Sequence, residues 1–274
     1  MELNRRWFWL LFALLFFWRF LHCGAELDLP HDWRQADTAF YIWDFYQNGI
    51  DLFQPAVCWM GPSENVILEC PLPEAMVAAL YWWFGENLFV ARLVFLLFFL
   101  GALYYFYQIT CLLWELQWAR WATIVYLALP LSWFYSRAIH IDFSAIFAAH
   151  AMLFYYLRGI QERRSLDLFW SSLWAIFAFL IKAPYAFYFA LPMLVFAFSQ
   201  QAFWWMIQRA IFFGLPIMLF VIWQQYVYQV NGQAPDWDYI LHYRKFNNNN
   251  HWYFGHWSRL YLRCFFTFSV LVKS

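Results

Sequence analysis

The sequence has few charged residues: they make up 12% of its 274 residues, against about 25% in soluble globular domains. Its 17 basic and 17 acidic residues cancel, so there is no global excess of positive charge for nucleic-acid binding. It also lacks a Walker loop, a dinucleotide fingerprint, HExxH and G-x-S-x-G, which disfavours an ATP-driven pump and a soluble nucleotide-sugar enzyme. The five cysteines show no metal-ligand spacing, and we expect neither a metal nor a cofactor.

Apolar residues are abundant instead, at 65% hydrophobic and 26% aromatic. A transmembrane helix needs about 20 mostly apolar residues, and several segments approach or meet that length. They predict seven complete spans and an eighth that begins near Arg259. The seven spans are residues 7–23, 88–110, 121–137, 142–157, 167–181, 184–199 and 210–230. The fold class is therefore all-α, a polytopic transmembrane helix bundle, and residues 1–274 form one domain that we expect to be incomplete at its C-terminus.

Two further segments are helical in pattern but too short to span. Residues 73–84 have Pro73 and Glu74 in the first turn and Gly85 at the end, which are helix start and stop signals. Residues 38–48 are rich in aromatic side chains. We interpret both segments as interfacial helices that lie on the membrane surface.

This interpretation also satisfies the positive-inside rule. It puts the N-terminus and the basic cluster at residues 158–164 in the cytoplasm. Residues 24–87 and 231–258 and the turns at 137–142 and 181–184 are then extracytoplasmic. The segment 24–87 holds ten acidic residues and one base, Arg34, and long ordered loops are usually functional.

A dense polar run, residues 31–38, lies at the centre of this long loop. Asp37 has two compatible interpretations. It could cap the helix that follows it, or it could act as a general base held at a helix N-terminus. Cys58 and Cys70 share the same loop and could pair in an oxidising compartment.

Three cations lie near the predicted outer ends of different spans: Arg92, Arg137 and Lys182. Ionisable residues at membrane depth usually face a cavity or a partner and mark function. We expect the three to converge on one phosphate, which fixed positive charge stabilises. The alternative for each one is that it extends to the lipid headgroups. Asp142, with His140 just before it, could pair with Arg137 or bind a sugar hydroxyl.

The run HDWRQADTAFYIWDFYQNGIDLFQP, residues 31–55, followed by Glu-Cys-Pro-Leu at residues 69–72, resembles the first extracytoplasmic loop of GT-C glycosyltransferases. The branch in question is similar to dolichyl-phosphate-mannose protein mannosyltransferases and lipid A aminoarabinose transferases. Further matches follow in order and extend the resemblance over roughly residues 1–200. They are residues 91–93, residues 134–138 with Asp142, residues 180–184, and residues 191–192.

The resemblance implies a polyprenyl-phosphate sugar donor and an acidic residue of the first loop as catalytic base. Asp37 is the first choice and Asp32 the second. Many relatives carry an Asp-Glu dipeptide where this chain has Arg34 and Gln35, which we expect to bind substrate. Glu69 stands where the family has a basic residue before Pro-Pro-Leu, so we expect it to contact hydroxyls of sugar or acceptor instead of phosphate.

These observations predict a multi-pass glycosyltransferase of the bacterial inner membrane with an extracytoplasmic active site. It would transfer a hexosyl or pentosyl group, with inversion, to a hydroxyl of a glycan, lipid or protein. Alternatives are a transporter or lipid flippase, which also needs intramembrane charge, and a truncated membrane protein without catalytic activity.

Overall fold

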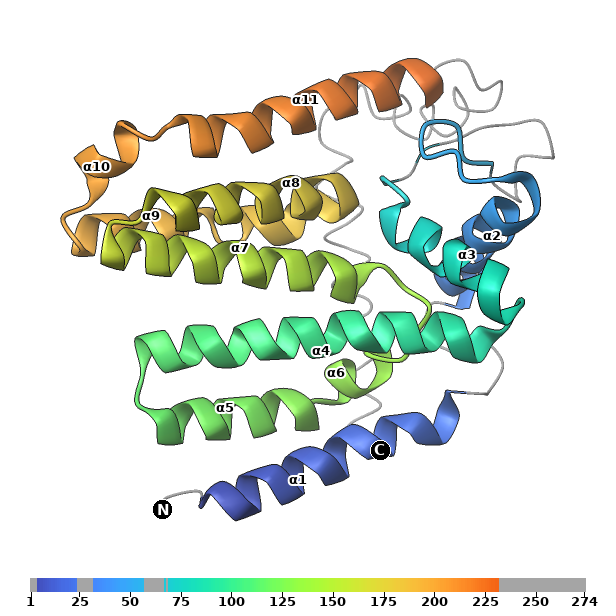
Figure 1. Ribbon diagram of the computed structural model, residues 1–274, viewed down its shortest axis with the longest axis horizontal. Coiled ribbons are helices and arrows are strands. Elements are labelled where there is room, and N and C mark those ends of the chain that lie inside the picture. The colour runs from blue at the N-terminus through green and yellow to red at the C-terminus, as the bar shows by residue number, and fades with distance from the viewer. Residues whose placement is uncertain (1–3, 24–31, 57–66, 68, 232–274) are drawn as a thin grey trace, which may run out of the picture. The chain divides into compact units, whose positions relative to one another are not determined.

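The computed structural model describes residues 4–23, 32–56, 67 and 69–231. All regular elements in these ranges are helices (Figure 1). They are α1 (Arg5–Phe17), the 3₁₀ helix η1 (Trp18–His22), α2 (Asp32–Asn48), α3 (Leu72–Phe84), α4 (Leu88–Leu113), α5 (Leu116–Ala128), α6 (Pro130–Tyr135), α7 (Asp142–Glu162), α8 (Ser165–Phe187), α9 (Ala190–Ser199), α10 (Phe203–Ile207) and α11 (Ile211–Asn231). Residues 1–227 form one compact unit, and only four residues of the second unit, 228–274, are described.

Four of the described helices are long and apolar enough to cross a membrane: α4, α7, α8 and α11. The helix α7 lies at the centre and packs against both α4 and α8. Large apolar side chains such as Leu97, Phe177 and Val221 are exposed on these helices, as expected for surfaces that face lipid. The prediction of an all-α, polytopic membrane fold is confirmed.

Two predicted spans have different boundaries in the structure. The segment 121–137 is divided between α5 and α6, because Pro130 lacks an N–H and begins a new helix. The predicted turn at residues 181–184 is wrong: α8 continues through it to Phe187 and contains a local break instead. The predicted eighth span and the outer segment 231–258 lie almost entirely outside the described residues.

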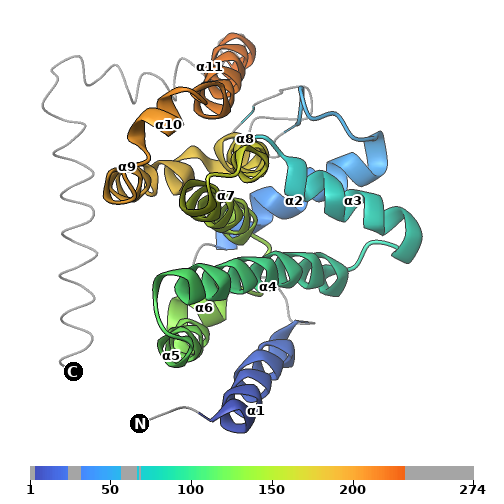
Figure 2. The same ribbon diagram turned by 60° about the vertical axis from the view of Figure 1, so that its left-hand side comes forward.

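The first predicted interfacial helix begins earlier than expected. The helix α2 starts at Asp32, so Asp37 lies inside it and is not its N-cap. The helix α3 has the predicted extent, and Gly85, at a φ of 76°, ends it in a conformation that favours glycine. The two helices pack together through Ile42 and Val77, at the end of the bundle where α4 and α7 begin (Figures 1 and 2). Their position at a membrane surface stays a prediction.

Buried polar side chains tie the helices to one another. Arg19 is fully buried and donates hydrogen bonds to Ser136 Oγ at 3.0 Å and to the Leu127 carbonyl at 2.7 Å. These contacts hold η1 against α5 and the segment that follows α6. Away from water, buried polar groups of this kind require partners inside the protein.

Gly101 permits the close packing of α4 on α7. A Cβ at this position would lie 2.5 Å from two ring atoms of Phe147. That ring is itself held by Tyr105 and Trp174, with centroid distances of 5.9 and 4.9 Å, so it has little freedom to move aside. The small side chain is therefore a packing requirement, as is common between membrane helices.

We expect Gly101→Ala to destabilise the protein by about 1–3 kcal/mol, through overpacking that outweighs the better helix propensity of alanine. Thermal unfolding in detergent, followed by tryptophan fluorescence, measures this effect. Gly214→Ala on α11 is the matched control, because no atom lies within 4 Å of its added Cβ. Equal unfolding temperatures for the two variants would contradict the packing requirement.

Candidate functional site

One half of the candidate site is a group of carboxylates around Arg34. Its guanidinium binds both carboxylate oxygens of Glu69, one of them at 2.5 Å. The same guanidinium lies 3.8 Å from Asp37, one turn further along α2. The helix explains this second contact, since residues three apart lie on the same face. Arg34, Asp37 and Glu69, three residues predicted to be functional, are thus brought together.

Asp37 is largely but not fully buried, with a side chain 10% exposed. Burial raises the pKa of this carboxyl above its ordinary value; Arg34 opposes the shift and Glu69 adds to it. A raised pKa makes Asp37 a stronger proton acceptor whenever it is ionised. Asp32, the second candidate base, is the first residue of α2, and its side chain lies outside the described part of the chain.

Gln35 attaches α2 to the turn between α6 and α7. Its side chain is buried, and its Oε1 accepts a hydrogen bond from the Ile139 backbone N–H at 3.2 Å. This contact gives Gln35 a structural role in addition to the predicted contact with substrate, which stays a prediction. It places the carboxylate group beside a turn that carries other predicted residues, Arg137 and His140.

The second half of the site centres on Asp142, the first residue of α7. Its Oδ1 accepts a hydrogen bond from Lys182 Nζ at 2.7 Å, and its Oδ2 lies 3.4 Å from His140 Nδ1. Tyr185 also hydrogen-bonds to Asp142, and its ring centroid lies 5.8 Å from the Lys182 ammonium. Asp142 thus pairs with Lys182 rather than with Arg137, the partner considered from the sequence.

Arg92 and Arg137 belong to a different neighbourhood. Both are almost fully buried, and both lie near enough to the Cys23 thiol to act on it electrostatically. The Arg137 guanidinium also lies 4.7 Å from the Trp133 ring centroid. The two arginines are therefore close to each other, as predicted, but Lys182 has its own partner. Its side chain is 28% exposed, which makes it the most accessible of the three cations.

A backbone hydrogen bond joins the two halves. The N–H of Cys70, next to Glu69, donates to the carbonyl of Leu180, two residues before Lys182, at 3.1 Å. Burial and the nearby Glu74 raise the pKa of the Cys70 thiol to about 12, so the thiol is neutral at physiological pH. Cys70 is a free thiol, and Cys58 lies outside the described residues.

Glu74 is a feature that the sequence presented only as a helix-start signal. It is 4% exposed, and its Oε2 has no hydrogen-bond partner among the described residues. Burial raises its pKa to about 8, Glu69 contributes in the same direction, and Arg34 and a backbone N–H oppose. Glu74 is therefore largely protonated at neutral pH. Within the described ranges, no three potential metal ligands form a cluster.

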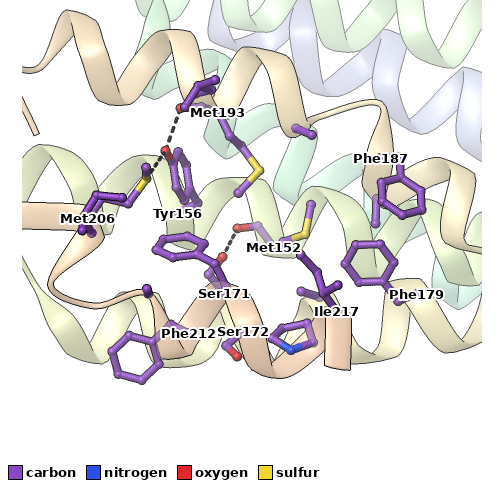
Figure 3. Close-up of a pocket in the computed structure, with 18 residues that line it drawn as sticks. Met152, Tyr156, Ser171, Ser172, Phe179, Phe187, Met193, Met206, Phe212 and Ile217 are labelled. Atoms are coloured by element: carbon purple, nitrogen blue, oxygen red, sulfur yellow. Dashed lines mark hydrogen bonds between the residues drawn. The ribbon is translucent and has the colours of Figure 1, made fainter. Parts of the chain in front are cut away.

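A separate apolar cavity of about 330 Å³ lies between α7, α8, α9, α10 and α11 (Figure 3). The hydroxyl groups of Tyr156 and Ser171 are engaged by backbone carbonyls, at 2.6 and 2.9 Å, so the lining is mostly hydrocarbon. One end of the cavity is formed by Ala186 and Phe187, about one helical turn beyond Lys182. The sequence gave no signal for this cavity, because its lining comes from five separate helices.

Apolar helices with a polar site at one end define a polytopic membrane protein with the GT-C fold. The chain is similar to the crystal structure of ArnT from Cupriavidus metallidurans bound to undecaprenyl phosphate, with a TM-score of 0.65 and 17% identity over 87% of this chain. The apo form of the same enzyme gives a TM-score of 0.62 and 17% identity over 85% of this chain. No protein-family model and no curated protein matches the sequence.

The resemblance seen in the sequence is thus confirmed at the level of the fold. The chain aligns with 44% and 43% of the two ArnT chains, and so spans less than half of their length. The roles of the individual residues are not tested by this likeness and remain predictions.

We expect Glu74→Gln to change the pH dependence of stability. Because the folded-state pKa of about 8 lies above the ordinary value of 4.5, the neutral form stabilises the fold fully below pH 4.5, and this contribution is lost as pH rises towards 8. Each pKa unit is worth about 1.4 kcal/mol. Unfolding temperatures should therefore favour the variant increasingly from about pH 5 to about pH 8. The exposed Glu86→Gln is the control, and an identical pH profile for both variants would contradict the assignment.

Proposed function

We propose that the chain is the donor-binding portion of a membrane glycosyltransferase that takes sugar from a polyprenyl phosphate. The observation that carries the proposal is the link between the halves of the site: the group around Asp37 is fastened by the Cys70 to Leu180 hydrogen bond to the helix that carries Lys182. ArnT, whose fold this chain shares, has been crystallised with undecaprenyl phosphate. The residues present suit such a ligand.

Asp37 is the proposed general base. It would accept the proton of an acceptor hydroxyl, whose oxygen attacks the anomeric carbon while the bond from that carbon to phosphate breaks. The leaving phosphate keeps the electron pair, and attack opposite to it inverts the configuration. The partly buried position of Asp37 and its raised pKa support this role.

Lys182 is the proposed phosphate ligand. An ammonium has three donors, and Asp142 accepts from one of them, so the others are available to an incoming phosphate oxygen. Fixed positive charge stabilises a leaving phosphate because it is already in place when negative charge develops. Arg92 and Arg137, which are more deeply buried, would add to the positive potential behind it. His140 and Asp142 would then contact the sugar.

The hydrocarbon chain of the donor would lie along α8. The apolar cavity starts about one helical turn beyond Lys182, and its volume of about 330 Å³ accommodates part of a flexible chain. Residues 24–87 would face the extracytoplasmic side, as the positive-inside rule predicts. The acceptor, a glycan, lipid or protein hydroxyl, would approach from the side of Asp37.

We expect Asp37→Asn to lower release of undecaprenyl phosphate from an undecaprenyl-phosphate-linked sugar by about 10²–10⁴-fold, while affinity for undecaprenyl phosphate is retained. Asp44→Asn is the matched control, since Asp44 lies on the same helix and bonds only to Asn48 among the described contacts. A transporter or flippase would keep its lipid movement in the Asp37 variant. Unchanged transfer activity would exclude Asp37 as the base.

We expect Ala190→Trp, which fills the cavity from α9, to weaken binding of undecaprenyl phosphate about tenfold or more, as the apolar contacts of the chain are lost. Binding of a short-chain prenyl phosphate should be unaffected, because its phosphate still reaches Lys182. Val125→Trp, at an exposed position on α5, controls for the added indole. Equal loss of affinity for the long and short lipids would place the chain elsewhere.

A further inference from the structure

The helix α8 is interrupted just before its end. Lys182 has φ of −161° and ψ of 90°, an extended conformation with helix on both sides. Two residues later comes Pro184, which has no backbone N–H and whose ring would collide with the carbonyl four residues back in a regular helix. That carbonyl belongs to Leu180, and it consequently has no donor within its own helix.

The Leu180 carbonyl is bonded by another part of the chain. The Cys70 N–H donates to it at 3.1 Å, and Cys70 follows Glu69, the residue that binds Arg34. A carbonyl without a partner in an apolar environment is costly, so this bond satisfies a group that the proline leaves open. A regular helix would offer no free carbonyl at this position.

The same interruption directs Lys182. In an unbroken helix, residues four apart share a face, so Lys182 would lie on the face of Ala186, which lines the apolar cavity. The extended residue changes this direction, and the ammonium reaches Asp142 at 2.7 Å. One local break thus accounts for a contact in each half of the site.

We propose that Pro184 is a positioning residue: by withholding one amide hydrogen, it fastens the loop that carries Glu69 to α8 and turns Lys182 towards Asp142. The proline touches no reacting atom in this scheme and acts through Leu180 and Lys182. The inference rests on the proposed function for the identity of the ligand, whereas the contacts themselves are independent of it.

Pro184→Ala tests this role because alanine supplies the missing N–H. The Leu180 carbonyl should then bond to residue 184, and the Cys70 amide should lose its acceptor. Hydrogen exchange at the Cys70 amide, measured in detergent without lipid, should accelerate at least about tenfold, corresponding to the loss of one buried hydrogen bond. Pro216→Ala is the matched control for this measurement, since Pro216 is also interior to a long apolar helix, α11.

A second measurement separates positioning from general damage. Affinity for undecaprenyl phosphate should fall about tenfold in Pro184→Ala and by a similar or larger factor in Lys182→Met, which lacks a charged donor. If Pro184 acts through Lys182, adding Pro184→Ala to Lys182→Met should cost little more, as in a double-mutant cycle with strong interaction. Pro184→Ser, which restores the same N–H with another side chain, should behave as Pro184→Ala does.

Unchanged exchange at Cys70 in both variants of Pro184 would overturn the inference. Full additivity of Pro184→Ala and Lys182→Met would also overturn it, because a purely structural effect would not depend on Lys182. If the wild-type chain fails to bind undecaprenyl phosphate but exchange at Cys70 still accelerates in Pro184→Ala, the proposed function fails and the assignment of Pro184 stands.

Discussion

A backbone carbonyl that loses its helical donor inside an apolar bundle has to find a donor within the protein, because the hydrocarbon around it supplies none. The Leu180 carbonyl is in this position, and the Cys70 N–H satisfies it. Gln35 solves the same problem for the turn before α7 by accepting from the Ile139 N–H. These two hydrogen bonds attach α2 and the Glu69 segment to the ends of α7 and α8. The arrangement of the acidic loop therefore depends on where the bundle leaves backbone groups open.

The charges are distributed as pairs with one accessible member each. Arg34 is held by Glu69 and leaves Asp37 at 3.8 Å, while Asp142 holds Lys182, which keeps two further donors. Desolvation offsets much of the attraction in partly buried ion pairs, so such pairs add little net stability. Their effect here is geometric. Each pair fixes the orientation of a side chain that a substrate could engage, a base on one side and a phosphate ligand on the other.

The sequence was informative where a pattern reports on its own segment. Apolar length identified the four long spans, and Pro73 with Gly85 bounded α3 almost to the residue. It failed where distant contacts decide: α2 extends back to Asp32 although its first turn is polar, and Pro184 looked like the start of a new span. The pairing of Asp142 with Lys182, 40 residues apart, has no local signal. Nor has the burial of Glu74, which a first-turn acid on an exposed helix would not share.

The break in α8 also resolves a conflict between two environments. The end of this helix has to present a cation to a polar site and alkyl groups to an apolar cavity, although Lys182 and Ala186 would share one face if the helix were regular. An ammonium directed into that cavity would lack both water and a counter-ion, at a cost of several kcal/mol. The extended backbone at Lys182 removes the conflict, since the residues before and after it no longer follow one helical register. A lipid phosphate could then have its charged end at Asp142 and Lys182 and its chain beside Ala186, along a single helix.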